Sequence, residues 1–111
     1  MKAIDRAKAH FEALEERSIA IPEWGDDGQP LKVYCKALTL QEKAKLYKMA
    51  QDNDLLLFVY AIIYKALDEN GEKLFSLEDK KALAEKADAD IVARLGAFIL
   101  SGMDVEDQEK N

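Results

Sequence analysis

The sequence predicts an α+β fold: a mostly α-helical single domain of about five helices, with one small β-hairpin near residues 19–37. Two patterns lead to this prediction. Over most of the chain, apolar residues recur at three- and four-residue steps, the period of a helix with one apolar face. Over residues 31–37 they alternate with other residues, the period of a half-buried strand. The length of 111 residues fits one domain with a modest core.

The first helix is expected over residues 2–17. Ile4, Ala7, Phe11 and Leu14 recur at helical spacing, and charged residues fill the other face. This pattern indicates an amphipathic helix with a single apolar stripe.

The hairpin is expected to follow. Ile19 and Ile21 alternate, but Pro22 cannot donate a hydrogen bond to a central sheet, so the first strand is predicted to be a short edge strand at best. Residues 25–30 are rich in glycine, aspartate and proline, which favour turns. The alternating segment 31–37 supplies the second strand.

Two helices are expected in the middle of the chain. Thr39 and Glu42 have the spacing of a capping box, which predicts a helix over about 40–51. The polar residues 52–54 offer a stop and a new cap. Residues 55–67 are apolar on almost every side, which places a helix at the centre of the core or under a partner.

A pair of strands is the competing interpretation for residues 55–67, because Val59, Ile62 and Ile63 are β-branched. The helix is favoured because thirteen residues pass without a turn signal. Asn70-Gly71 then marks a turn, and Ser76 resembles a second helix cap.

The last two helices are expected over about 77–87 and from Asp88 to Gly102, a plausible C-terminal stop. The apolar set of the final helix is wider than a narrow stripe, so its members serve the core, a partner contact, or both. The wide apolar set comprises Ile91, Val92, Leu95, Phe98, Ile99, Leu100 and Met103.

Residues 104–111 are polar and mainly acidic, which predicts a flexible tail after a domain spanning 1–103.

The formal net charge of −6 makes nucleic acid and anionic membrane surfaces poor partners and favours basic ones. The single cysteine, Cys35, suits a reducing cytoplasm. The longest apolar run, residues 55–64, is far shorter than the roughly 20 residues that span a bilayer. No segment of the signal-peptide kind is visible at the N-terminus.

No constellation of residues predicts catalysis, a metal site or a cofactor. His10 is the only histidine and has no partner spacing, and Cys35 is expected as a small buried residue on its strand. An EF-hand reading that uses Gly71 as the sixth loop position places Ala66 first and Leu77 last, where carboxylates are required. The sequence therefore favours a protein that binds another protein over an enzyme.

Trp24 is the only tryptophan and lies between an edge strand and a turn. A tryptophan at such a place is either a lid on the core or an exposed anchor for a partner. The lid is favoured because a small chain needs its large aromatic residues in the core. The candidate partner-binding residues are Trp24, Ile91, Leu95, Phe98, Ile99 and Met103.

Several segments, taken in order, resemble one known family. They are residues 21–25 (IPEWG), the strand over 31–37, the capped helix start over 38–43 and residues 68–79 (DENGEKLFSLED). A leucine-bearing helix, a final apolar helix that ends near Ser101-Gly102 and an acidic tail follow. This order is similar to that of the tail assembly chaperones of long-tailed (siphophage-like) bacteriophages and prophages, which are encoded just before the tape measure protein. The resemblance covers about residues 19–111.

The resemblance implies a non-enzymatic role in the cytoplasm of a bacterial host. Such proteins bind the long, helical tape measure protein, keep it soluble and help tail tube subunits assemble around it; they are generally absent from the mature virion. The partners it implies are the tape measure protein, tail tube subunits and other copies of the chain itself. The alternative is a minor structural tail protein, such as a completion or connector protein, because the same features suit both roles.

In this family a fraction of ribosomes slip near the end of the gene and make a longer product. The C-terminal residues Glu109, Lys110 and Asn111 can be encoded as GAA-AAA-AAC, which contains a slippery heptamer. The alternative is that these three residues simply form a polar tail. Reading the codons of the gene distinguishes the two.

Overall fold

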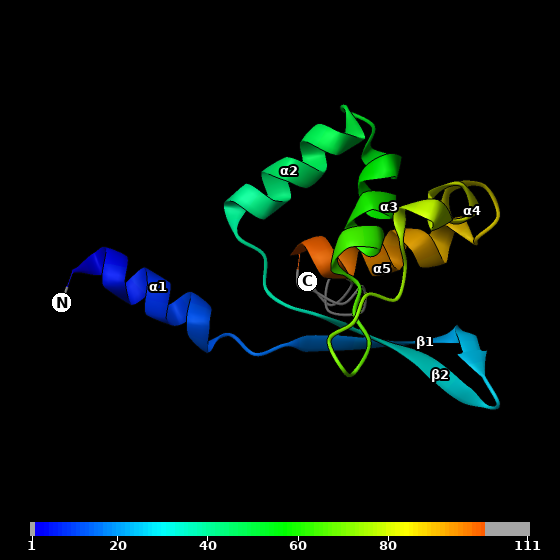
Figure 1. The fold of residues 1–111 in the computed structure, drawn as a ribbon, viewed down its shortest axis with the longest axis horizontal. Helices are drawn as coiled ribbons and strands as arrows, with labels where there is room; N and C mark the ends of the chain where they lie inside the picture. Colours follow the sequence, from blue (N-terminus) through cyan, green and yellow to red (C-terminus); the bar gives the residue numbers. More distant parts are fainter. Residues whose placement is uncertain (1, 102–111) are drawn as a thin grey trace, which may run out of the picture.

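The computed structural model describes residues 2–101 and confirms the α+β fold, with all helices after the first gathered above one two-stranded antiparallel sheet (Figure 1). The elements in chain order are α1 (Ala3–Ala13), β1 (Arg17–Asp26), β2 (Gln29–Cys35), α2 (Leu40–Ala50), α3 (Asp54–Lys65), a 3-10 turn η1 (Leu77–Asp79), α4 (Lys80–Glu85) and α5 (Ala89–Ser101).

The first helix is shorter than expected. α1 ends at Ala13, and Leu14 is already extended, with φ −66° and ψ 129°. The expectation of a helix to residue 17 is wrong because Arg17 belongs to the sheet, where it lies opposite Cys35. α1 projects away from the rest of the chain, and none of its residues is buried (Figure 1).

The hairpin is confirmed, with β1 and β2 antiparallel and Ile19 opposite Val33. β1 is longer than the short edge strand that was expected. Its pairing with β2 does not end at Pro22, because it resumes at Asp26 after a shift in register between Ile21 and Asp26. Gly25 lies in this irregular stretch, where a Cβ atom would fall 2.1 Å from the backbone oxygen of Gln29. A larger residue at that position would therefore push the two strands apart.

The capped helices of the middle of the chain are confirmed. The Thr39 hydroxyl accepts from the backbone N–H of Glu42, and the Glu42 carboxylate accepts from the backbone N–H of Thr39. α3 is a helix rather than a strand pair, and Asn53 caps it by accepting from two backbone N–H groups, at 3.0 and 3.1 Å. Because local capping and periodicity agree in these two segments, their structure follows the sequence closely.

The core lies where α3 crosses α5, with the hairpin below and α2 beside α3 (Figure 1). α3 supplies Leu57 and Ile62, α2 supplies Leu46, and the sheet supplies Val33. The segment after α3 also reaches the sheet, because Leu67 and Tyr34 exchange two backbone hydrogen bonds of 2.8 Å. The expectation that residues 55–67 form a helix at the centre of the core is confirmed for most of the segment, although Leu55 is exposed and α3 itself ends at Lys65.

The helix expected over about 77–87 is divided. A 3-10 turn opens it, with the Asp79 carboxylate accepting from the backbone N–H of Ser76 at 2.8 Å, and α4 then ends at Glu85. The turn expected at Asn70-Gly71 is present, and Gly71 takes a φ of +82° that favours glycine.

Several expectations fall outside the described residues. They are the helix stop at Gly102, the role of Met103, the flexible tail over 104–111 and the residues Glu109, Lys110 and Asn111. Within residues 2–101, no helix is long and apolar enough to cross a lipid bilayer.

Candidate binding surface

The structure places four of the candidate residues of the last helix inside the core. Ile91, Leu95, Phe98 and Ile99 are at most 6% exposed. They pack on α3 and the hairpin side of the molecule, so a partner can reach their side chains only if this packing opens. The sequence left two roles open for these residues, in the core and in a partner contact. The structure shows that they belong to the core. A partner contact through them stays a prediction, and their burial disfavours it.

Trp24 has the double character that the sequence left open. It packs against the edge of the core and meets Phe75 edge to face, with ring centroids 6.2 Å apart and the planes at 70°. It also lines an open hollow of about 250 Å³ together with residues of α4. We call this space the Trp24 hollow; its wall includes Phe75, Leu83 and Ala87.

A second hollow, of about 140 Å³, opens on the other side of α4, between α3 and α5. We call it the α3 hollow. Its wall is apolar and includes Phe58, Ala84 and Val92, and Leu55 lies at its edge with 74% of its surface exposed. An exposed leucine beside an apolar hollow is typical of a surface that accepts apolar side chains.

The two hollows form one surface, because Leu83 and Ala87 line both. We call it the α4 surface and define it by Trp24, Leu55, Phe75, Leu83, Ala84 and Ala87. The hollows of the α4 surface follow from the sequence of α4. Alanines alternate there with larger residues, and their small side chains leave space unfilled. Asp79 and Lys86 also line the Trp24 hollow and supply charge at its border.

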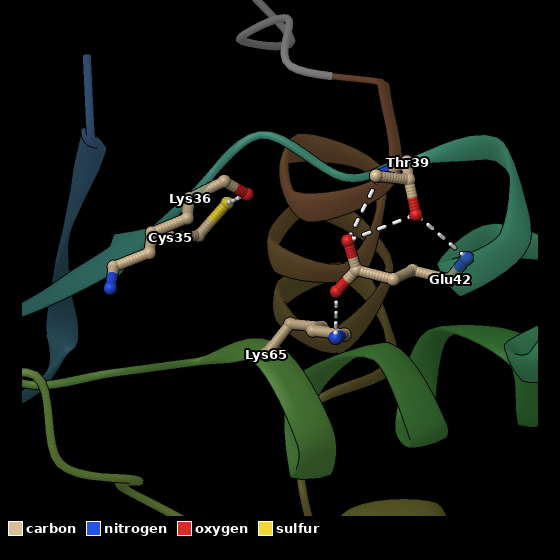
Figure 2. A network of polar contacts seen from close by, with 5 residues as sticks. All are labelled: Cys35, Lys36, Thr39, Glu42 and Lys65. Atoms are coloured by element: carbon tan, nitrogen blue, oxygen red, sulfur yellow. Dashed lines mark hydrogen bonds and ion pairs between the residues drawn. The ribbon is translucent and has the colours of Figure 1, made fainter. Parts of the chain in front are cut away.

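The groups with perturbed acidity lie away from the α4 surface. Glu42 pairs with Lys65 from α3 and with Thr39, and these hydrogen bonds hold the pKa of its carboxyl below the ordinary value (Figure 2). Burial raises the pKa of the Cys35 thiol, against the influence of the nearby Arg17. Both interactions stabilise the fold, and neither faces an apolar hollow of the α4 surface.

The Cys35 thiol is confirmed as a buried group. Arg17 donates from Nη2 to the Cys35 sulfur at 3.1 Å and from Nη1 to the backbone oxygen of Phe98 at 3.0 Å, and its guanidinium lies over the Phe98 ring at 5.1 Å. Arg17 therefore joins the start of β1 to α5. Its side chain was not singled out from the sequence, because its three contacts lie far away along the chain.

A third concavity, of about 590 Å³, carries charge of both signs. Its lining includes Glu23, Asp88, Asp90 and Arg94, and Arg94 pairs with Glu23 at 3.3 Å. Among residues 2–101 no three histidine, cysteine or carboxylate side chains are grouped as metal ligands. The arrangement around Arg94 is that of a surface ion pair at the junction of β1 and α5.

Comparison of the chain with protein-family models, with curated proteins and with solved structures finds no match. The function must therefore be argued from the residues and from the surface they form. The α4 surface itself was not predicted from the sequence, apart from Trp24. The local signal for it is the set of alanines at positions 82, 84, 87 and 89, among which Leu83 is the single large apolar residue.

Proposed function

We propose that this protein is a tail assembly chaperone, which binds the tape measure protein of a long-tailed bacteriophage or prophage, keeps it soluble and promotes assembly of the tail tube around it. The observation that carries the proposal is the α4 surface, an open apolar surface with two adjacent hollows on a chain of net charge −6. The resemblance of residues 21–25 and 68–79 to that family names the kind of partner. The protein acts by binding, without catalysing a reaction.

The two hollows suit an amphipathic helix. Apolar side chains three or four residues apart project from one face of such a helix, and each hollow accepts one of them. Burying one leucine-sized side chain contributes roughly 1.5–3 kcal/mol, so two anchors offset a substantial part of the cost of association. A long helical protein with a repeated apolar stripe offers many equivalent segments for this contact.

The acidic character of the chain supports the solubilising part of the role. An exposed apolar stripe drives helical proteins to aggregate, and a bound acidic domain both covers the stripe and adds repulsion between complexes. The same charge attracts lysine- and arginine-bearing segments of a partner. In this proposal the protein works in the cytoplasm of the bacterial host and leaves before the virion matures.

The test uses the protein encoded by the long, coiled-coil-rich reading frame downstream of this gene. Co-expression with the present chain is expected to yield a soluble complex that survives size-exclusion chromatography. Ala84→Glu places a charge at the α3 hollow from an exposed helical position and is expected to weaken capture by about 10-fold or more. Ala44→Glu makes the same change at an exposed position of α2 and is expected to leave capture unchanged.

Two results would contradict the proposal. If the downstream protein is equally soluble alone and no complex forms, the chaperone role is wrong. If Ala84→Glu captures the downstream protein as well as the unaltered chain does, the α4 surface is not the binding site. Mass spectrometry of purified particles addresses the alternative, because a minor structural tail protein stays in mature tails and a chaperone does not.

A further inference from the structure

Among residues 2–101, the apolar stripe of α1 is not buried against any other element. Ile4, Phe11 and Leu14 are 58%, 38% and 48% exposed, and Ala7 between them is exposed as well. α1 stands clear of the helices and the hairpin (Figure 1). Residues 2–101 therefore leave the stripe open to solvent.

Such a helix is not stable on its own. α1 has only 11 residues, no side chain caps its N-terminus, and none of its residues is buried. Isolated helices shorter than about 12–15 residues are marginal in water, and most helices in proteins depend on packing of their apolar face. Packing of the stripe against another molecule would supply the missing stabilisation.

The stripe has the heptad spacing of a coiled-coil seam and is symmetric about Ala9. Ile4 and Leu14 lie five positions to either side of that residue, and Ala7 and Phe11 lie two positions to either side. In an antiparallel pair of identical helices, Ala7 meets Phe11 of the other copy, and Ile4 meets Leu14, the residue that directly follows α1. The ring of Phe11 in each copy then lies opposite Ala7 of the other copy. Such alternation of large and small residues fills a seam between helices without voids.

The charges of α1 select the same orientation. Its first half carries Lys2, Arg6 and Lys8 against a single Asp5. Residues 9–16 carry Glu12, Glu15 and Glu16 and no lysine or arginine; Glu12 lies in the second half of α1, Glu15 and Glu16 lie in the segment between α1 and β1, and Arg17 comes next. An antiparallel pair brings the basic half of one helix beside the acidic half of the other, whereas a parallel pair brings like charges together.

We propose that α1 is a dimerisation helix, and that its occupant is α1 of a second copy of this chain in antiparallel orientation. The contact is isologous, because each helix presents the same stripe to the other. Since α1 spans only about 16 Å, the seam is short, and the dimer forms reversibly at protein concentrations on the order of 100 μM. The α4 surface is made of other elements, so the dimer offers two such surfaces.

The experiment is analytical ultracentrifugation of the full chain from about 5 μM to 1 mM, with variants. The unaltered chain is expected to pass from monomer to dimer. Phe11→Glu is expected to raise the dissociation constant by about 10-fold or more, because it places a charge in the seam. Leu40→Glu is the matched control, since Leu40 is 85% exposed on α2, and it is expected to dimerise as the unaltered chain does.

A charge exchange tests the pairing of the two halves. The double variants Glu12→Lys with Glu15→Lys, and Arg6→Glu with Lys8→Glu, each give α1 one predominant sign of charge and are expected to remain monomeric when alone. An equimolar mixture of the two is expected to form a heterodimer, because the predominantly basic α1 of one variant then pairs with the predominantly acidic α1 of the other. Thermal unfolding is the control: no residue of α1 is buried within residues 2–101, so these substitutions are expected to leave the Tm of the body unchanged.

Three results would overturn the proposal. One is an unaltered chain that remains monomeric at 1 mM, and another is a Phe11→Glu variant that dimerises normally. The third is a mixture of the charge variants that shows no heterodimer. If the unaltered chain remains monomeric and Phe11→Glu loses capture of the downstream protein, the stripe binds that partner and not a second copy, while the proposed function stands.

Discussion

Gly96 of α5 lies directly against Phe58 of α3, so closely that a Cβ atom on Gly96 would fall 2.6 Å from the Cβ of Phe58 and 2.9 Å from its Cα. The main crossing of the core therefore depends on the absence of a side chain at this position. Both residues are on long helices with apolar faces, and the close approach buries the residues around them.

Gly96→Ala is expected to lower the free energy of unfolding by about 1–3 kcal/mol, because the two helices must separate to admit the methyl group. Urea unfolding followed by circular dichroism measures this change. Ala44→Gly, at an exposed position of α2, reports the ordinary preference of a helix for alanine over glycine, about 1 kcal/mol. The intrinsic preference measured with Ala44→Gly is then subtracted from the change in unfolding free energy of Gly96→Ala. If the corrected change is zero, the contact between α3 and α5 can accommodate a methyl group at position 96.

The capping box of α2 predicts a pH dependence. The pKa of Glu42 lies below its ordinary value of 4.5 because of its hydrogen bonds to Lys65 and Thr39. A lowered pKa means that this carboxylate stabilises the fold fully above about pH 4.5 and loses its contribution as the pH falls through the folded-state pKa. Glu42→Gln is expected to be less stable than the unaltered chain at pH 7, and the difference is expected to shrink towards pH 3.

The measurement is a pair of urea titrations at each pH, with Glu12→Gln as the control at an exposed glutamate of α1. A constant difference between the Glu42→Gln variant and the unaltered chain from pH 7 to pH 3 would contradict the role assigned to the carboxylate. The cap itself is tested by Thr39→Ala, which is expected to cost about 1 kcal/mol.

The thiol of Cys35 is expected to react slowly in the folded protein. It is buried, and burial raises its pKa, so both access and the thiolate fraction are low. Alkylation by iodoacetamide at pH 8, followed by mass spectrometry, is expected to be at least about 100-fold slower than in the urea-unfolded chain. Equal rates in the two states would show that the region around β2 opens readily.

Arg17 links the hairpin to α5, and its removal is expected to lower stability. Arg17→Ala loses two hydrogen bonds and the contact with the Phe98 ring, for an expected loss of about 2–3 kcal/mol in the free energy of unfolding. Arg6→Ala, on the exposed α1, is the control and is expected to change stability by less than about 0.5 kcal/mol. A small effect of Arg17→Ala would mean that solvent replaces these contacts freely.

The Trp24 contact with Phe75 has an optical signature, since Trp24 is the only tryptophan. Phe75→Ala is expected to shift the fluorescence emission to longer wavelength, because the indole loses an aromatic neighbour and gains water. Tyr47→Ala, which removes an exposed aromatic residue of α2, is expected to leave the emission unchanged. An unchanged emission maximum in Phe75→Ala would show that residues other than Phe75 determine the environment of the Trp24 indole.

The sequence by itself determined the local structure of this protein. The capping boxes at Thr39 and Ser76, the Asn53 cap, the turn at Gly71 and the alternation over 31–37 each depend on residues within a few positions of one another. Their hydrogen bonds and backbone preferences act over that same short range, so the elements could be predicted from the sequence. The order of helices and the single hairpin follow from them.

Only the tertiary structure decided which apolar surfaces are covered. The stripes of α1 and α5 have the same helical period, yet α5 is buried against α3 and α1 is left open. The end of α1 before Arg17, the pairing of Trp24 with Phe75 and the two hollows beside Leu83 arise in the same way. Periodicity shows that a helix has an apolar face, but burial depends on residues far away along the chain, and these contacts exist only after the chain has folded.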